Sequence, residues 1–511
     1  MIQIDALPIF AIIPSMMAGF LLILLGERVS RSVHVTLTSI VTFIAMISSL
    51  ILYTHTKDGK VIIHKMGGWS PPIGIVIAVD ALNSLFSLVV SLIVLFSTIY
   101  SYRYMEHDDG HSYFYALICL MLCGMNGIIL TGDLFNLFVF FEISAIASYG
   151  LVAFRKDEWE PVEAGFKYAM ISAIGTVFLL LGVALIYGLF GVLTMASIAE
   201  RVSTGTFLEG ARTNGNYVIP IAAAFLIWSF GIKAAMAPMH TWLPDAHPAA
   251  PSPISAILSG VFVKVGVYAM IRLLYTIYGL SISNDLMPYL AGFGAFSMIV
   301  GAYIALVQDD VKRMLAFSTV LNIGFILFGI GIGSKLSLTG SLLHVVNHAI
   351  TKALLFLAAG SVIYRTEIRS MSRLGGLIKK MPITAIVFLI ASLSIVGVPS
   401  TNGFISKFII LKAGIETGEL SYTIYVVVGV VTSIVAAAYM LRAFRQIFLG
   451  EAKSDITHVR EAPISMLIPM VILTILIVIL GIFPQIGIDL VKPAVESAFG
   501  RERYIEQVLV K

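Results

Sequence analysis

Long apolar runs follow one another along almost the whole chain, separated by short stretches that carry charges, glycines or prolines. A helix needs about 20 apolar residues to cross the bilayer core, and each run approaches or exceeds that length. Strands of a membrane barrel alternate polar and apolar residues, and these runs do not alternate. The pattern therefore predicts an all-α polytopic membrane protein with fourteen spans, at residues 6–26, 32–53, 77–102, 113–131, 134–154, 162–190, 217–237, 254–278, 287–307, 312–333, 338–363, 383–411, 421–447 and 463–490.

Prolines and glycines interrupt the seventh and twelfth spans, in the segments MAPMHTWLPDAHPAAPSP and VGVPSTNG. Proline removes a backbone hydrogen bond and clashes with the preceding helical turn. In a membrane, the freed backbone groups must face protein or a watery cavity. A lysine lies beside each interruption, Lys233 before the first and Lys407 after the second. Interrupted spans five helices apart indicate two inverted repeats around a transport site, although glycine and proline are also frequent in ordinary membrane helices.

The predicted organisation is one membrane domain, 1–511, built around these two repeats. Its expected parts are helices 1–3 in 1–110, helices 4–8 in 111–280, helices 9–13 in 286–450, and helix 14 with the C-terminal tail in 460–511. An even number of spans places both termini on one side, and lysine and arginine concentrate in the loops that would then be cytoplasmic. We therefore expect both termini on the outer face of the cell membrane.

Composition supports this class and excludes several others. The chain is 58% hydrophobic and only 12% charged, with a mean hydropathy of +0.96, whereas soluble domains contain about 25% charged residues. Its basic residues lie in short loops, so the net charge of +4 gives no reason to expect nucleic-acid binding. The chain has no P-loop, dinucleotide fingerprint or cysteine cluster, so no cofactor and no redox centre is expected in it. Cys119 and Cys123, four residues apart in one apolar helix, are expected to be buried thiols.

Five ionisable residues stand inside otherwise apolar spans: Glu142, Lys233, Lys264, Lys352 and Lys407. A charge at bilayer depth costs about 2.5–3.5 kcal/mol on insertion scales, so such residues usually have a partner, water or a function. The series predicts a route for protons or cations, in which Glu142 and Lys233 form an ion pair that opens and closes. The alternatives are a static ion pair at those two residues and, at Lys264, a lysine that extends towards the membrane surface.

His344, His348 and Lys352 fall on one face of the eleventh span, at intervals of four residues. A histidine pair at this spacing is able to bind zinc or haem, but a neighbouring cation would repel a metal. Imidazole titrates near neutral pH, which favours a proton relay. A haem-binding cytochrome and a purely packing role are the alternatives, and no metal site is expected.

Other polar residues have simpler interpretations. His240 and His247 flank the interruption of the seventh span and either gate access to water or brace the loop. Asp133 is expected to cap the fifth helix, with a role in ion access as the alternative. Arg272 is expected near the membrane interface, and the charged turn 309–313 is expected at the surface.

Five segments of the chain resemble one family: FNLFVFFEISAIASYGL, KAAMAPMHTWLPDAHPAAPSPISAILSGVFVKVGVYAMIR, DDVKRMLAFSTVLNIGF, HAITKALLFLAAG and GVPSTNGFISKF. They are similar to the antiporter-like subunits shared by Mrp-type sodium/proton antiporters, respiratory complex I and the membrane-bound hydrogenases. The resemblance implies a fourteen-helix fold with inverted repeats in helices 4–8 and 9–13 and a central hydrophilic axis. The family's relay positions match Glu142, Lys233, Lys264, His348, Lys352 and Lys407.

Two departures favour one branch of that family. Asn322 stands where many members carry a histidine, and the chain ends soon after its fourteenth span. Together with a lysine at position 407, this ending is most similar to the D-type Mrp subunit and its hydrogenase counterparts.

The resemblance implies a proton-translocating subunit of a multi-subunit membrane complex, working in sodium/proton antiport or in redox-driven pumping. Its partners would be other membrane subunits, joined by a peripheral redox module in the redox-driven case. The translocated ions would be protons, with sodium left open. A structural anchor without an ion path of its own remains the alternative.

Overall fold

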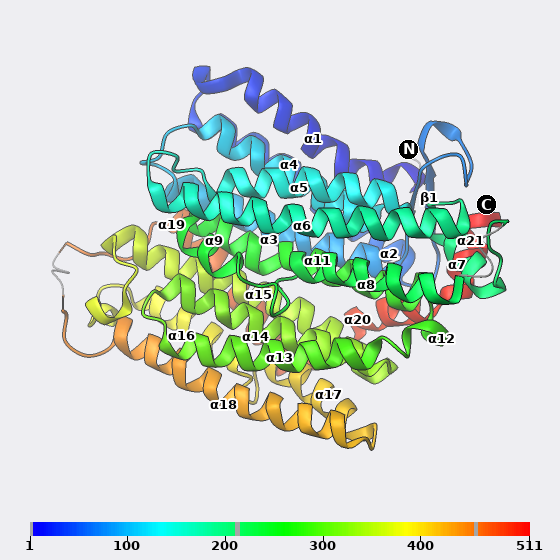
Figure 1. Cartoon of the computed structure of the whole chain (residues 1–511). Coiled ribbons are helices and arrows are strands. Elements are labelled where there is room, and N and C mark those ends of the chain that lie inside the picture. Colours follow the sequence, from blue (N-terminus) through cyan, green and yellow to red (C-terminus); the bar gives the residue numbers. More distant parts are fainter. Residues whose placement is uncertain (1–3, 210–214, 454–457, 511) are drawn as a thin grey trace.

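The computed structural model describes residues 4–209, 215–453 and 458–510 and consists mostly of long, nearly parallel helices (Figure 1). Among the described residues, twelve helices are long and apolar enough to cross a membrane. Two shorter apolar helices, Tyr217–Lys233 and Pro382–Val396, belong to the two interrupted spans. The fourteen spans predicted from the sequence are therefore all found as helical segments.

The chain begins with a helical pair, a small hairpin and a third long helix: η1 Ile4–Ala6, α1 Leu7–Leu25, η2 Gly26–Arg28, α2 Arg31–Thr56, β1 Ile62–Lys65, η3 Met66–Gly68, β2 Val76–Val79 and α3 Ala81–Tyr104. The middle of the chain contains α4 His111–Leu130, α5 Leu134–Val152, α6 Trp159–Phe190, α7 Met195–Thr204, α8 Gly215–Lys233, α9 Leu243–Ala249, α10 Ser252–Ile257, η4 Leu258–Phe262, α11 Val263–Ile271, η5 Arg272–Ile277 and α12 Leu280–Ser283. The last part contains α13 Met287–Val307, α14 Val311–Ile332, α15 Lys335–Thr366, η6 Met371–Arg373, η7 Leu377–Lys379, α16 Pro382–Val396, α17 Asn402–Glu416, α18 Leu420–Phe448, α19 Ile464–Ile482, α20 Pro484–Phe499 and α21 Arg501–Val510.

Two long helices form the centre of the bundle. The continuous helix Ser252–Ile277, which joins α10, η4, α11 and η5, and the helix α15 are fully buried over their most apolar windows. The corresponding buried share is only 33% for α1, α6, α18 and α19. The outer helices therefore present apolar side chains outwards, where a membrane protein meets lipid or its partner subunits, and both termini lie at the same end of the bundle (Figure 1).

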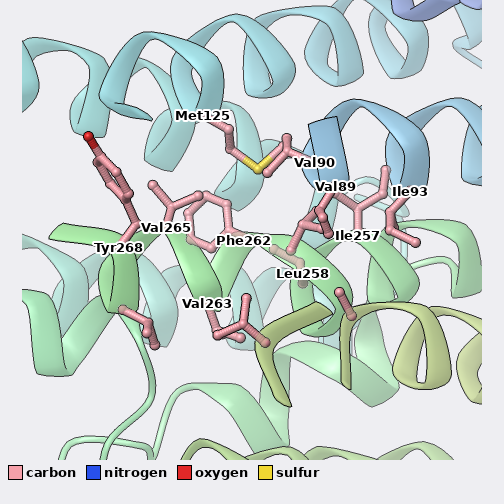
Figure 2. Close-up of a cluster of buried hydrophobic side chains, with 14 of the residues drawn as sticks. Val89, Val90, Ile93, Met125, Ile257, Leu258, Phe262, Val263, Val265 and Tyr268 are labelled. Carbon is pink, nitrogen blue, oxygen red and sulfur yellow. The ribbon is translucent and has the colours of Figure 1, made fainter. Parts of the chain in front are cut away.

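Most of the apolar core forms one cluster around these central helices, and a second, smaller cluster joins α13, α14, α17 and α18. Val90 and Ile93 of α3 and Met125 of α4 pack towards Ile257 and Phe262 of the central helix (Figure 2). Close packing of this kind leaves few voids, so a polar side chain in the core has a defined set of neighbours.

Both interruptions occur where the prolines and glycines predicted them. The helix α8 ends at Lys233, and regular helix resumes only in α9 and α10. The indole of Trp242 donates to the carbonyl oxygen of Ile232 at 2.9 Å, which satisfies one of the backbone groups freed by the break. In the twelfth span, α16 stops at Val396 and Gly397 continues with a φ of 91°, a left-handed conformation that favours glycine.

Two predicted spans begin or end differently in the structure. Residues 76–79 form strand β2, paired antiparallel with β1, and helix α3 starts only at Ala81 after a capping box built on Asp80. The β-branched residues of β2 favour the strand, and the Asp80 carboxylate accepts from the backbone amides of the first turn. At the other end of the chain, the predicted span 463–490 ends at Ile482, and Pro484 starts the separate helix α20. The assignment of helices 4–8 and 9–13 to inverted repeats stays a prediction.

Candidate functional site: a polar axis across the bundle

The axis begins at Glu142 on α5, which is partly exposed on the flank of the bundle. The hydroxyl of Thr176 on α6 donates to its carboxylate at 2.5 Å. One helical turn earlier on α6, Ser172 accepts a hydrogen bond from the buried ammonium of Lys233, whose charge also lies 5.8 Å from the ring centre of Phe141. Glu142 and Lys233 thus each form a hydrogen bond with a hydroxyl group of the same helix, α6.

The ion pair predicted between Glu142 and Lys233 is not formed. Within the described residues, no lysine nitrogen lies within 4.0 Å of the Glu142 carboxylate. Serine and threonine hydroxyls hold the two groups apart, and hydroxyls are able both to donate and to accept a proton. The structure therefore shows the two groups without a direct ion pair, and an opening and closing of the pair stays a prediction.

Lys264 is the second residue of α11, directly after a π-helical segment, and is 1% exposed. Its ammonium donates to the carbonyl oxygen of Ser259, inside the π-helical turn. A π-helical turn displaces the regular hydrogen bonds, and such turns are frequent at functional sites. A small residue allows close approach of the two helices here, because a Cβ atom on Gly266 would lie only 2.7 Å from the carbonyl oxygen of Phe230 on α8.

The buried helix α15 carries the next three groups on one face. Its Lys352 donates to the carbonyl oxygen of Leu315 on α14 at 2.8 Å. His344 contacts the hydroxyl of Ser406 at 2.9 Å and the side-chain oxygen of Asn322 at 3.2 Å, so Asn322 contributes to the axis despite replacing a histidine. The rings of His344 and His348 stack with centroids 5.8 Å apart. Neither ring nitrogen of His348 has a hydrogen-bond partner among the described residues.

The far end of the axis is Lys407 on α17. Its ammonium donates to the carbonyl oxygens of Ile395 and Val396 at 2.8 and 3.2 Å, the last residues before α16 breaks. The same charge lies 4.7 Å from the ring centre of Phe325. The second interruption therefore supplies the acceptors that hold a buried ammonium.

These groups form two parts, the Glu142–Lys233 end beside α6 and a central group that contains Lys264, His344, His348, Lys352 and Lys407. Lys264 lies close enough to His344, His348 and Lys352 for direct electrostatic interaction, and Lys407 interacts with the same three groups. The series takes its residues from α5, α6, α8, α11, α15 and α17, so it passes from helix to helix. Its lysines are held by neutral oxygens, and among the described residues no carboxylate forms a salt bridge with any of them.

The other predicted polar residues take separate positions. Asp133 caps α5 by accepting from the amides of Phe135 and Asn136, both at 2.9 Å. The pKa of Asp133 lies above its ordinary value because the carboxyl is largely buried. His240 is almost buried beside the ring of Phe317, and His247 is wholly buried against Phe356.

The charged turn after α13 was predicted at the surface, and for Lys312 that prediction is wrong. Lys312 is 2% exposed, and its ammonium donates to the carbonyl oxygens of Pro248 and Ala250. The end of α9 and its link to α10 cover Lys312. The local charge pattern in the sequence does not predict this contact. Its neighbour Arg313 remains half exposed and pairs with Asp245 at 2.9 Å.

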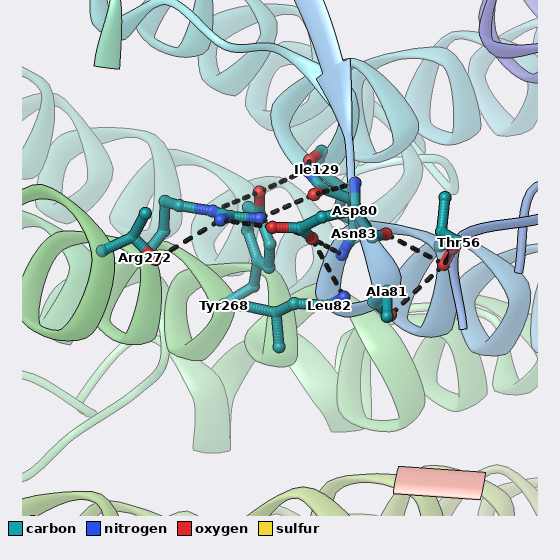
Figure 3. A network of polar contacts seen from close by, with 10 residues as sticks. Thr56, Asp80, Ala81, Leu82, Asn83, Ile129, Tyr268 and Arg272 are labelled. Carbon is teal, nitrogen blue, oxygen red and sulfur yellow. Dashed lines mark hydrogen bonds and ion pairs between the residues drawn. The ribbon is translucent and has the colours of Figure 1, made fainter. Parts of the chain in front are cut away.

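A buried charge pair escaped the sequence analysis. Arg272, expected near the interface, is 1% exposed and pairs with Asp80 at 2.7 Å (Figure 3). Asn83 also accepts from the guanidinium, at 2.6 Å, and Tyr268 lies against it. The pKa of the Asp80 carboxyl lies below its ordinary value: burial is the largest single effect and raises it, but the attraction of Arg272 and the hydrogen bonds from Arg272 and Asn83 together outweigh burial. The sequence signal for this pair was one acid directly before α3 and one base near the end of the helix Ser252–Ile277.

No group of three or more histidine, cysteine, aspartate or glutamate residues suited to a metal ion occurs in the described part of the chain. Both cysteines are buried free thiols, as their spacing predicted. The axis consists of amines, imidazoles, hydroxyls and one carboxylate. These groups bind and release protons, and together they define a multi-pass membrane protein with a buried chain of titratable side chains.

Comparison with known proteins identifies the family. Residues 131–435 match the family described as NADH:quinone oxidoreductase/Mrp antiporter, TM, and residues 67–115 match the N-terminal family of complex I chain 5. The chain therefore belongs to the antiporter-like membrane subunits shared by NADH:quinone oxidoreductases and Mrp antiporters.

Individual relatives come from both branches. The chain is 35% identical to the N subunit of the NADH-quinone oxidoreductase of Desulforudis audaxviator (strain MP104C) over 82% of this chain and 84% of the relative. It is 31% identical to the D-type subunit of the Na(+)/H(+) antiporter of Bacillus subtilis (strain 168), covering 87% of each protein. A chain of the membrane-bound sulfane sulfur reductase, an archaeal respiratory membrane complex, superimposes with a TM-score of 0.89 at 31% identity, over 98% of this chain and 99% of that one.

Proposed function

We propose that this chain is the proton-translocating subunit of a multi-subunit membrane complex, and that Glu142, Lys233, Lys264, His348, Lys352 and Lys407 form its relay. The observation that carries the proposal is the series of buried amines and imidazoles, in which each lysine is held by neutral oxygens. The relatives in both branches are subunits of membrane complexes by name.

The geometry suits a stepwise transfer of protons. Lys264 stands centrally, within electrostatic reach of His348 and Lys352, so a proton gained by one group disfavours a second proton on its neighbours. Glu142 at one end acts on the series by approaching or leaving Lys233. Since hydroxyl groups already bridge that gap through α6, a small side-chain movement is enough to change the charge felt by Lys233.

Removal of one amine from the relay tests the proposal. Lys264→Met or Lys407→Met in the whole complex, reconstituted into vesicles, should lower proton flux by about 100-fold, the usual contribution of a positioned proton-transfer group. Lys412→Met is the matched control, because Lys412 lies on the same helix as Lys407 but is half exposed and pairs with Glu416 at 3.6 Å.

Copurification of the partner subunits shows whether the complex still assembles. A structural anchor without an ion path predicts full flux in every variant that assembles. Wild-type flux in a correctly assembled Lys264→Met complex would therefore refute the relay.

The driving force has two candidates. Sodium/proton antiport is favoured by the similarity to the Bacillus antiporter chain, and redox-driven pumping by the similarity to a respiratory reductase chain. The translocated ion is the proton in both, with sodium as the counter-ion in the first. Proton uptake that depends on a sodium gradient, in vesicles without an electron donor, separates the two.

The proposed location is the cell membrane, with both termini on the outer face and the two halves of the axis carried by inverted repeats. Arg28, Arg155, Arg369 and Lys379 lie in connections that follow odd-numbered spans, on the side opposite the termini, which supports this orientation. A cysteine at Tyr217 or Lys335, near the end that holds the termini, should react with an impermeant thiol reagent added outside intact cells.

A further inference from the structure

An apolar groove of about 800 Å³ runs along the outside of the bundle, with walls formed by α2, α3 and α19. The helix α3 packs against both of the other two. Ile40 and Phe43 of α2 line the groove and are about half exposed, although both are large and apolar. Exposed apolar surface of this kind marks contact with a membrane or with another protein. We call this depression the lateral groove.

One end of the lateral groove is polar. Ser32, Thr36 and Ser39 line it from the first turns of α2, at intervals that place them on one face of the helix. Tyr102, near the end of α3, and Ser465, at the start of α19, line the same end. The phenol oxygen of Tyr102 lies 3.4 Å from the hydroxyl oxygen of Ser32. Hydroxyl groups from three helices therefore surround this end of the groove.

The other end of the lateral groove is apolar. Ile40, Phe43 and Ile44 line it from α2, and Leu95 lines it from α3. These residues follow the hydroxyl-bearing residues along α2 and precede Tyr102 along α3, so polarity falls steadily with distance from the polar end. An amphiphile, with a polar head and a hydrocarbon chain, has the same order of polarity along its length.

The length of the lateral groove matches one leaflet of a membrane. On α2 it extends from Ser32 to Ile44, about 18 Å, because an α-helix rises about 1.5 Å per residue. One leaflet supplies about 15 Å of hydrocarbon, half of the bilayer core. A spanning helix of a partner subunit would need the full core of about 30 Å, whereas α2 continues to Thr56 beyond the end of the groove. The groove therefore fits a lipid chain better than a second protein helix.

A cation lies beside the polar end. The guanidinium carbon of Arg31 is 4.8 Å from the ring centre of Tyr102. A guanidinium stacked on a ring keeps N–H donors at its edge, in the geometry that a phosphate accepts. Among the described residues, no carboxylate forms a salt bridge with Arg31. The nearby acid Glu27 accepts instead from the amide and the hydroxyl of Ser112, at 3.0 and 2.7 Å.

We propose that the lateral groove binds one anionic phospholipid, with a hydrocarbon chain between α2 and α3 and the phosphate at Arg31. Basic residues at a membrane surface attract anionic head groups, and both α2 and α19 begin at this end, so the positive ends of their dipoles add to the attraction. Because α2 begins where α1 ends, the lipid belongs to the leaflet on the side opposite the termini. The site shares no residue with the relay, so the two proposals stand or fall separately.

Photolabelling tests the position of the chain. The whole complex in detergent, washed free of loosely held lipid, is incubated with a limiting amount of phosphatidylglycerol that carries a diazirine in the middle of one chain. After illumination, mass spectrometry should find the label on the segments 40–44 and 95–99. Ser39→Trp places a large ring in the groove and should abolish this labelling. Val33→Trp adds the same ring at an exposed position of α2 outside the groove and should leave it unchanged.

Competition between unlabelled lipids tests the head group. Phosphatidylglycerol, which is anionic, should displace the probe at about a tenfold lower concentration than the zwitterionic phosphatidylcholine, the effect of about one hydrogen bond to a charged group. Arg31→Gln should remove this preference. Arg103→Gln is the matched control, because it removes the same charge one residue from Tyr102, where Arg103 pairs with Glu106 at 2.9 Å.

Copurification of the partner subunits gives the remaining readout. A complete complex in Ser39→Trp shows that the lost label reports the lipid. Absence of label from α2 and α3 in the wild type, or equal labelling in Ser39→Trp, overturns the lipid site. An unlabelled wild type together with loss of a partner subunit in Ser39→Trp assigns the groove to a partner helix, which also overturns it. Equal displacement by the two lipids in the wild type overturns the role of Arg31.

Discussion

Single residues in this protein show two ways of keeping a charge in an apolar interior. The relay lysines are held by carbonyl and hydroxyl oxygens, whereas Arg272 is held by the carboxylate of Asp80 and the amide oxygen of Asn83. A neutral cage leaves the amine free to lose its proton, while a carboxylate locks the guanidinium in its charged form. The neutral surroundings of the lysines suit proton transfer, and the ion pair of Arg272 suits a structural role.

The Asp80–Arg272 pair should therefore control stability. Asp80→Asn leaves the guanidinium buried without its counter-charge, which should lower the free energy of unfolding by about 3–5 kcal/mol. Thermal denaturation of the purified protein in detergent measures the effect. Glu416→Gln is the control, because its exposed pair with Lys412 contributes about 0–1 kcal/mol.

The sign of the pH dependence follows from the Asp80 carboxyl. Because its pKa is lowered in the folded state, the stabilisation is complete above the ordinary carboxyl pKa of about 4 and is lost as the pH falls through the folded value. The difference between wild type and Asp80→Asn should therefore be constant from pH 5 to pH 8, to within about 1 kcal/mol. A difference that vanishes within this range would contradict the pairing.

At the scale of the helix, close approach between elements decides where the relay groups lie. The helix α11 meets the end of α8 at Gly266, so Lys264 and Lys233 lie on neighbouring helices that touch through backbone atoms. Breaks in α8 and α16 expose carbonyls, which then accept from Trp242 and Lys407. The irregular parts of the helices thus provide the polar environment of the axis.

Gly266→Val tests this contact. A Cβ at Gly266 would lie 2.7 Å from the Phe230 carbonyl oxygen and 2.8 Å from the Ala234 nitrogen, so α11 must move away from α8. Overpacking of this kind costs about 1–3 kcal/mol, and proton flux should fall because the two lysines separate. Gly188→Ala in α6 meets nothing within 4 Å and should leave both stability and flux unchanged.

The sequence predicted the features that depend on local pattern. Span length, the two breaks and the buried lysines follow from hydropathy, proline and charge, and all appear in the structure. The burial of Lys312 and Arg272 did not follow, because in the sequence both lie near the ends of predicted spans, where charges usually meet water. Lys312 and Arg272 are shielded from water only in the folded structure. The end of α9 and its link to α10 cover Lys312, and the start of α3 covers Arg272.

At the scale of the whole molecule, the C-terminal helices tie distant elements together. Arg501 of α21 donates to the carbonyl oxygens of Ala199 and Ile277, at 2.7 and 3.2 Å. Gln507 accepts from the amide of Val61, and the ring centre of Tyr504 lies 5.1 Å from the Arg272 guanidinium. One short helix therefore links the hairpin, α7 and the central helix at the end of the bundle that holds both termini.

Tyr504→Ala should weaken this tie. The side chain is 3% exposed, and truncation of a buried aromatic ring costs about 3–5 kcal/mol. Thermal unfolding should shift downwards, whereas Glu502→Gln, on the exposed side of the same helix, should leave the midpoint unchanged. An unchanged midpoint in Tyr504→Ala would show that α21 does not contribute to global stability.

The wide turn at Leu258–Phe262 sets the direction in which the following side chains project from the helix axis. Relative to regular winding, such a turn holds one additional residue, and each residue of an α-helix adds about 100° of rotation. Deleting Val261 would let the helix wind regularly and swing Lys264 by roughly a quarter of a circle, out of line with His348. One surplus residue thus keeps the central amine aimed at its neighbours.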